Sequence, residues 1–250
     1  MKTLQALSSF GNNHSYIKFE QKEPKELSSG RKFVVGACTA AGVVTSLAIL
    51  SKNSGYSFSK MFKTPIKDTY LMKQDYHAKE IIPIATGSVL GGFVGGMLVD
   101  KKENWNAKFR EGVVQLLGNI SIPIMCVELF SIAGKAISSK FKMPQINGAA
   151  KWVTPVNNLL NGLPQVVASL GGLAVGIPLG NKTANLLNEK VFNKKDNREI
   201  IIEDFSAHLD DLCVAASYIS EDNWITKGVG RIVPIALMVA GNSVGQMQEK

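Results

Sequence analysis

Cysteine and histidine are scarce in this 250-residue chain, with three of each. Three scattered cysteines do not make a disulfide framework, and neither residue type recurs at the spacing of a structural zinc site. Glycine occurs 23 times without a fixed period, which excludes a collagen-like chain. Apolar residues make up 45% of the chain, which excludes wholesale disorder. The remaining classes are a globular protein and a membrane protein.

Charge is missing from five long stretches, although the chain has 28 basic and 20 acidic residues and a net charge of +8. Glu128 is the single charged residue inside them. A soluble amphipathic helix carries charges every few residues on its outer face. Long uncharged stretches are instead typical of helices in hydrocarbon, where about 20 apolar residues cross the bilayer. The stretches are 33–50, 81–99, 112–134, 152–181 and 232–248.

We therefore expect an all-α, polytopic membrane protein with four or five transmembrane helices. The alternative is a soluble bundle of buried Gly/Ala-rich helices, because the mean hydropathy is only +0.07. Stretch 152–181 is too long for one upright span, so we expect an interfacial or re-entrant lead-in over 152–162 and a span over 163–181. A helix on the membrane surface follows this span. The last stretch, 232–248, is the shortest and weakest candidate.

The chain divides into four parts by charge and apolar pattern. Lysines alternate with aromatic residues in the loop 51–80, which favours an interfacial belt beside anionic lipid over nucleic-acid binding. If five spans alternate in direction, loop 100–111 and residues 249–250 lie on opposite sides of the membrane. The parts are a polar tail (1–32), a helical membrane domain (33–191), a soluble amphipathic helical segment (192–225), and a last membrane helix with the C-terminus (226–250).

Glycines spaced four apart are the clearest pattern within the stretches. Such residues share one helix face, and a face without side chains lets another helix backbone approach closely. We predict helix packing through these faces, with a lipid groove or a pore wall as the alternative. The spacing leaves open whether they pack within one chain or in a homo-oligomer. The predicted helix-packing residues are Gly87, Gly91 and Gly95, their neighbours Gly92 and Gly96, and Gly172, Gly176 and Gly180.

Glu128 is the one functional candidate among the ionisable residues. A carboxylate inside a span is by default a proton relay or an ion ligand. Glu128 lies seven residues before Lys135, however, so it sits in the outer third of the span and can reach the interface. Its alternative role is that of an ordinary interfacial side chain.

A second charged pattern occurs on the amphipathic helix predicted over 199–219. Asp204, His208 and Asp211 share one flank of this helix, an arrangement that a metal could use. The simpler interpretation is an i, i+4 contact between Asp204 and His208 with solvated carboxylates. No second ligand cluster and no catalytic motif accompany them. We therefore expect no metal, no cofactor and no catalytic residue.

These patterns predict a non-enzymatic integral membrane protein, multi-pass in a plasma or inner membrane, with a scaffold or packing role. Its expected partner is the lipid bilayer and not nucleic acid. The alternative is a channel or small-solute transporter, which needs a polar cavity at mid-membrane. Asn119 with Pro123, and Pro164 with Gln165, are the residues that could build such a cavity.

Overall fold

The computed structural model describes residues 26–54, 77–141, 144–148, 153–194 and 224–249. Within these ranges every regular element is a helix. The elements are α1 (Ser29–Ser54), α3 (Ala78–Val99), η2 (Lys102–Asn104), α4 (Trp105–Val114), η3 (Gln115–Ser121), α5 (Ile122–Lys140), α6 (Val153–Lys190) and α9 (Trp224–Gln246).

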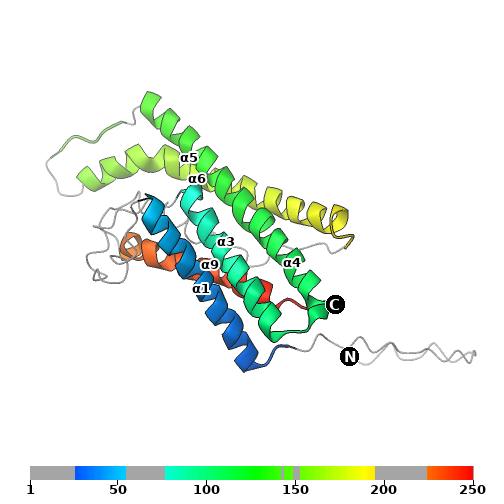
Figure 1. The fold of residues 1–250 in the computed structure, drawn as a ribbon. Helices are drawn as coiled ribbons and strands as arrows, with labels where there is room; N and C mark the ends of the chain where they lie inside the picture. The colour runs from blue at the N-terminus through cyan, green and yellow to red at the C-terminus, as the bar shows by residue number, and fades with distance from the viewer. Residues whose placement is uncertain (1–25, 55–76, 142–143, 149–152, 195–223, 250) are drawn as a thin grey trace, which may run out of the picture.

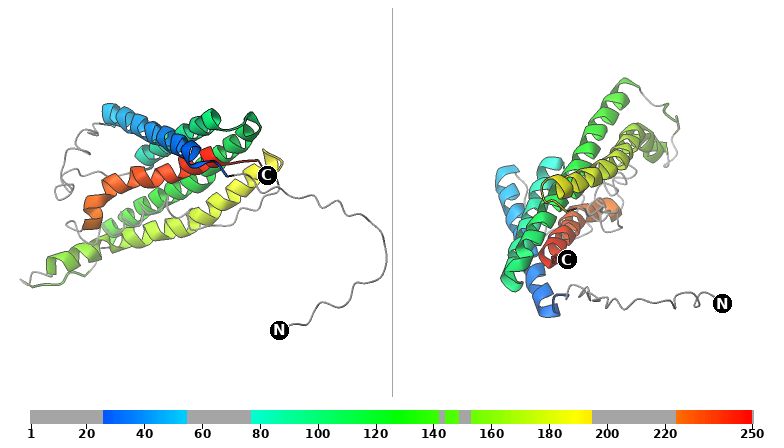
Figure 2. Two further views of the ribbon diagram at one scale, coloured as in Figure 1. Left: turned by 90° about the horizontal axis from the view of Figure 1, so that it is seen from below. Right: turned by 90° about the vertical axis from the view of Figure 1, so that its right-hand side faces the viewer.

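Helix α3 lies at the centre of the bundle (Figures 1 and 2). It contacts α1 on one side, α9 on another and the α4–η3 region on a third, while α6 packs against α5. The apolar core joins residues of α1, α3, η3, α5 and α9, so burial follows the uncharged stretches of the sequence. Its fully buried members include Leu47, Ile84, Val89, Ile120 and Leu237.

Four helical segments are long and apolar enough to cross a membrane, at the lower end of the predicted four or five. The tail 1–25 and most of the loop 51–80 lie outside the described residues. The segment 199–219, with Asp204, His208 and Asp211, lies outside them too. The candidate spans are Ser29–Lys52, Ala78–Val99, Lys102–Lys140 and Leu160–Lys190.

The third candidate span contains an irregular segment beside Pro123. Residues Gln115–Ser121 form a π-helix, and the N–H of Ile122 bonds to the carbonyl of Leu117, five residues earlier. Proline offers no N–H and its ring crowds the preceding turn. A proline and a widened turn next to it are both usual causes of a bend in a long helix.

Helix α6 corrects one part of the prediction for the fourth stretch, namely its division into separate elements, whereas the position of each part relative to a membrane stays a prediction. It runs without a break from Val153 to Lys190, so the lead-in, the span and the surface helix expected separately form one element of 38 residues. Pro164 and Pro178 lie inside it. Packing against α5 along this length supports the helix where two prolines each remove a backbone donor.

Helix α9 runs parallel to α3. Successive spans were expected to alternate in direction, which would have made these two helices antiparallel. Ser88 Oγ donates to the carbonyl of Leu237 at 2.7 Å. Further along both helices, Gly96 faces Gly245. The C-terminus therefore lies at the same end of the bundle as the α3–α4 turn. This arrangement corrects the expectation that 100–111 and 249–250 lie on opposite sides, because α9 starts at the far end of the bundle (Figure 1).

Candidate functional site

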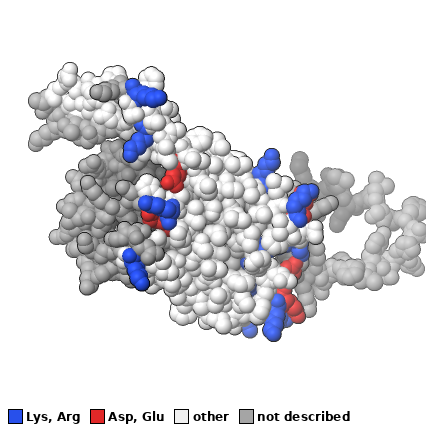
Figure 3. Space-filling model, turned by 45° about the horizontal axis from the view of Figure 1, so that its top comes forward, with Lys and Arg blue, Asp and Glu red and all other residues white. Residues whose placement is uncertain are grey.

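One face of the bundle carries a broad uncharged belt. Figure 3 shows acidic and basic side chains gathered towards two ends of the molecule, with white surface between them. Lys32 and Lys52 lie 20 residues apart in α1, about 30 Å at 1.5 Å per residue, which matches the hydrocarbon core of a bilayer. Large apolar side chains are exposed in this belt, among them Val44, Leu90, Val94, Leu98 and Met125.

Three glycines of α3 lie directly against the backbone of α1. A β-carbon added to Gly95 would lie 2.8 Å from Cβ of Cys38, and one added to Gly91 would meet the carbonyl of Cys38 even more closely. Gly87 lies against Gly42 in the same way. Real β-carbons essentially never come this close, so any larger residue at these positions has to displace the α1 backbone.

The neighbouring glycines of α3 face α9. A β-carbon at Gly92 would lie 2.9 Å from Cα of Gly241. At Gly96 it would lie 2.8 Å from Cδ of Lys108 and 2.9 Å from Cα of Gly245. The two glycine lines of α3 thus face two different helices of the same chain.

The glycines of α6 face the π-segment and α5. A β-carbon at Gly172 would lie 2.7 Å from the carbonyl oxygen of Cys126, and one at Gly176 would lie 2.7 Å from Cα of Pro123. Gly180 lies against the carbonyl of Gly118. All three are buried, so this surface of α6 contacts α5 and η3.

Glu128 lies where α5 passes the first turn of α3. Its Oε2 accepts a hydrogen bond from the backbone N–H of Ala78 at 3.1 Å, and its Oε1 lies 3.8 Å from Nδ1 of His77. Glu80 accepts from the backbone N–H of His77 at 3.0 Å. The first N–H groups of a helix have no intrahelical partner and carry a partial positive charge. The contact of Glu128 is therefore that of a helix cap, and a proton or ion role for it stays a prediction.

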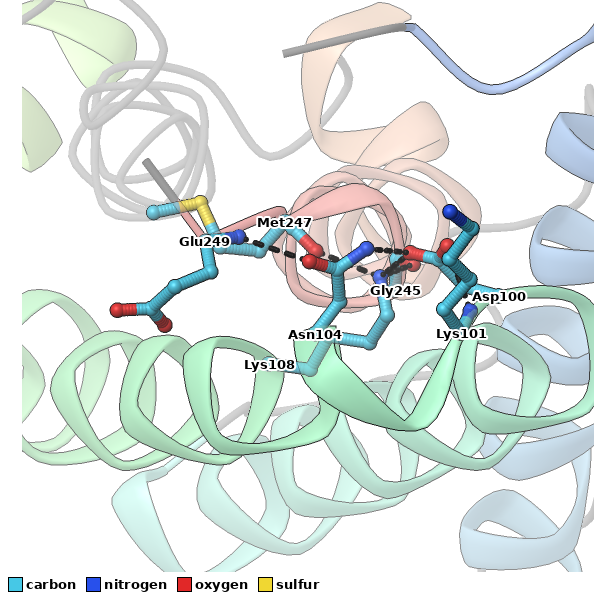
Figure 4. Close-up of polar contacts among 7 residues, drawn as sticks. All are labelled: Asp100, Lys101, Asn104, Lys108, Gly245, Met247 and Glu249. Atoms are coloured by element: carbon cyan, nitrogen blue, oxygen red, sulfur yellow. Dashed lines mark hydrogen bonds and ion pairs between the residues drawn. The ribbon is translucent and has the colours of Figure 1, made fainter.

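A buried ion pair joins the turn after α3 to α4 (Figure 4). Lys108 Nζ lies 2.8 Å from Oδ2 of Asp100, and the two side chains are 0% and 5% exposed. The same ammonium group donates to the carbonyl oxygens of Gly245 at 2.8 Å and Met247 at 2.6 Å. An ammonium has three donors, so all three have acceptors.

The carboxylate of Asp100 also accepts several hydrogen bonds. Burial is the largest influence on its carboxyl and favours the neutral acid, but hydrogen bonds from Lys108, the N–H of Lys101 and Asn104 together outweigh it. The net effect lowers the pKa of Asp100 below its ordinary value. The charged pair is thus the stable form at neutral pH.

The same cluster holds the C-terminal residues. Asn104 Oδ1 accepts from the backbone N–H of Glu249 at 3.1 Å, and the Glu249 carboxylate pairs with Lys194 beyond the end of α6. The cluster therefore ties the ends of α3, α6 and α9 to the start of α4.

A ladder of polar side chains continues from α4 into the π-segment. Gln115 Nε2 donates to Oε1 of Glu111 at 2.7 Å, and Asn119 Nδ2 donates to Oε1 of Gln115 at 2.9 Å. Gln115 and Asn119 are buried. Polar groups inside a span bond to one another because lipid offers no partner.

The two residue pairs predicted to build a transport cavity do not come together. Asn119 is next to Gly118, which contacts Ala184 of α6. Gln165 contacts Gly134, at a different height along the same pair of helices. Gly118 and Gly134 are 16 residues apart, about 24 Å along the helix. Gln165 instead donates to Ser131 Oγ at 3.0 Å.

Sequence reasoning missed Asp100 and Lys108 as partners, because residues 100–111 read as a polar link. One signal was available: Lys108 lies four residues before Gly112 and therefore on the same helix face as a small residue. A lysine on a packing face has to find an acceptor inside the protein. The acceptors of Lys108 are backbone carbonyls at the end of α9, more than 130 residues away, and no sequence pattern identifies them.

Among the described residues, no group of three or more His, Cys, Asp or Glu side chains could hold a metal ion. Cys38 and Cys126 are free thiols within helices, where each lies against a glycine of a neighbouring helix. Comparison with protein-family models, curated proteins and solved structures finds no match for this chain.

Proposed function

We propose that this chain is a multi-pass integral membrane protein with a structural, non-enzymatic role, in which glycine seams hold the helices together. The uncharged belt is the observation that carries the proposal, because it exposes large apolar side chains. On α1 it lies between Lys32 and Lys52, about 30 Å apart along the helix, which is the thickness of a bilayer core. We place it in a plasma or inner membrane, with lipid as its surroundings.

The close backbone contacts support a glycine-zipper packing role. Helices in lipid gain little from burying apolar surface against one another, so close van der Waals packing at small residues has to supply much of the association energy. Seams on both lines of α3 and along α6 use this device. Because the predicted glycines face helices of their own chain, a homo-oligomer would need another surface, such as the open one at Gly36.

The pairing of the buried charges supports a non-enzymatic role. Lys108 and Asp100 are bound to each other, and Glu128 caps α3. A catalytic group has to be able to reach a substrate, and these contacts occupy the atoms that would do so. The role we propose is therefore that of a membrane-embedded scaffold.

Membrane fractionation tests the proposal. The protein should stay in the membrane pellet after alkaline carbonate washing and require detergent for release. Release by carbonate alone would contradict it and would make the chain a soluble bundle.

A channel or small-solute transporter is the second candidate, and the polar ladder in the π-segment favours it. π-helical turns are frequent at functional sites. Beside the ladder, Asn188 of α6 is buried and its Oδ1 has no hydrogen-bond partner among the described residues. Asn188 lies one turn from Ala184, which contacts Gly118 of the π-segment. A small polar solute or water could occupy this interface.

Flux measurements on purified protein in liposomes separate the two candidates. If the ladder conducts, Gln115→Leu and Asn119→Leu abolish the flux of small polar solutes while the protein remains folded. A scaffold gives no flux above that of empty liposomes in either form.

A further inference from the structure

The α5–α6 hairpin extends beyond the other helices. Figures 1 and 2 show its closed end projecting past the nearby ends of α1 and α3. The contact between Glu128 and Ala78 marks the level at which α3 begins. Helix α5 continues for 12 residues to Lys140, about 18 Å further. We call residues Leu129–Phe141, 144–148 and 153–167 the hairpin tip.

The length of the third candidate span places the tip at the membrane surface. Lys102–Lys140 has 39 residues, about 58 Å of helix, which is nearly twice the thickness of the hydrocarbon core. The polar start of this segment, around Lys108 and Glu111, lies at the level of the buried ion pair. The part of this segment that exceeds the thickness of the hydrocarbon core therefore lies at its other end, beyond Glu128.

Side-chain contacts across the hairpin make the tip a defined unit. Ser138 Oγ donates to the carbonyl of Asn161 at 2.9 Å, and Gln145 Nε2 donates to Oδ1 of Asn161 at 2.8 Å. Asn157 exchanges two hydrogen bonds with the backbone of Ile146, at 2.9 and 3.0 Å. These contacts join the end of α5, residues 144–148 and the start of α6 to one another.

The surface of the tip is apolar and basic. Lys135 and Lys140 are exposed, and the sequence has no acidic residue from 129 to 188. Phe141 is 70% exposed. Eight large apolar side chains of the tip are exposed, and a patch of this kind marks a site that contacts a membrane or another protein. They are Leu129, Phe130, Ile132, Ile137, Phe141, Ile146, Leu163 and Val167.

We propose that the hairpin tip lies on the surface of the same bilayer and binds anionic lipid headgroups. Apolar side chains enter the boundary between headgroups and acyl chains, while lysine ammonium groups contact phosphate oxygens. The lack of any acidic residue on this part of the chain is the reason to choose an anionic surface. This inference rests on the proposed membrane function.

Photolabelling from lipid tests the proposal on the full chain. The protein is reconstituted in phosphatidylcholine vesicles with or without phosphatidylglycerol, together with a phospholipid that carries a diazirine near the glycerol level. Ile137 and Phe141 should be labelled in the phosphatidylglycerol vesicles and much less in phosphatidylcholine alone. A lysine near an anionic surface contributes about 1 kcal/mol, so Lys135→Gln with Lys140→Gln should weaken docking about 30-fold.

The matched control removes two exposed lysines at the other end of the chain's long hairpin, Lys182→Gln with Lys190→Gln, and should leave the labelling of Phe141 unchanged. Equal labelling in both lipids and in both variants would mean that the tip is embedded irrespective of charge, which overturns the proposal. Labelling that falls as protein density rises would mean that a second copy covers the tip, which also overturns it.

Two further positions separate failure of this proposal from failure of the membrane function. Val44 and Leu90 lie in the uncharged belt and should be labelled in every vesicle by a second phospholipid, whose diazirine is in the acyl chain. If they are labelled and Phe141 never is, only the proposal for the tip fails. If none is labelled, the membrane function itself is wrong.

Discussion

Lys108 Nζ contacts Oδ2 of Asp100 at 2.8 Å across the turn between α3 and α4, and both side chains are almost fully buried. Two charges without water depend on each other, because the desolvation of each is offset only by its partner and by further hydrogen bonds. Lys108 adds bonds to Gly245 and Met247, so the pair also fixes the end of α9.

Removing one partner of this pair should be strongly destabilising. Lys108→Met leaves the Asp100 carboxylate buried without its counter-charge, for which about 3–5 kcal/mol is typical. The Tm of the detergent-solubilised protein should fall markedly. The double variant Lys108→Met with Asp100→Leu should recover part of the loss, and the exposed Lys101→Met should have little effect. A double variant that falls by the sum of the single losses would contradict the coupling.

The same pair predicts the direction of the acid response. The folded protein has a lowered Asp100 pKa, so the unfolded chain takes up the proton first as the pH falls. The stabilisation by Asp100 is fully present above the unfolded value of 3.8 and is lost as the pH falls through the lower folded value. Unfolding of the parent and of Asp100→Asn, compared from neutral pH to below pH 3.8, should show a stability difference that shrinks only in the acid range.

The seam between α1 and α3 predicts a steric effect that opposes hydrophobicity. Gly91→Leu adds apolar surface, which favours membrane insertion, but it places a side chain where the Cys38 carbonyl lies. We expect the steric effect to dominate and to lower stability by about 1–3 kcal/mol or more, measured as Tm in detergent. Gly95→Leu should behave alike.

Two controls accompany the glycine prediction. Gly36→Leu makes the same change on α1, where an added β-carbon meets nothing within 4 Å, and should be tolerated. Leu90→Ala removes a side chain that is 57% exposed and should also have a small effect. If Gly91→Leu is as stable as Gly36→Leu, the seam does not carry the packing.

Glu128 predicts a graded response to substitution, because capping needs an acceptor and gains from charge. Glu128→Gln keeps an acceptor for the Ala78 N–H and should cost about 0.3–1 kcal/mol, the usual contribution of a charge at a helix N-terminus. Glu128→Ala removes the acceptor too and should cost about 0.5–2 kcal/mol. Chemical unfolding measures both. Equal stability of all three proteins would point away from capping and towards an ion or proton role.

The uncharged stretches were enough to predict that the described part of the chain is helical, and to predict the positions of most of its helices. Hydropathy is a local property, and the stretches 33–50 and 81–99 fall inside α1 and α3. The continuity of α6 was not predicted, because Pro164 and the asparagines before it are signals of a break. Packing against α5 outweighs these local signals.

The contacts between distant segments were beyond the sequence. Glycine spacing indicates a packing face but not its partner, and Gly92 and Gly241 carry no mark that pairs them. Gly118 of the π-segment likewise lies against Gly180 and Ala184 of α6, and nothing in the sequence pairs these residues. Glu128 was identified as a functional candidate, but its contact with Ala78 required the position of α3.

The parallel course of α3 and α9 brings the end of α9 to the end of the bundle at which α3 also ends. In a bilayer, the four candidate spans return the chain to the side of Asp100 by Lys190, whereas α9 begins on the opposite side and ends beside Lys108. The contacts of Lys108 with Gly245 and Met247 therefore form only when the end of α9 lies on the side of Asp100.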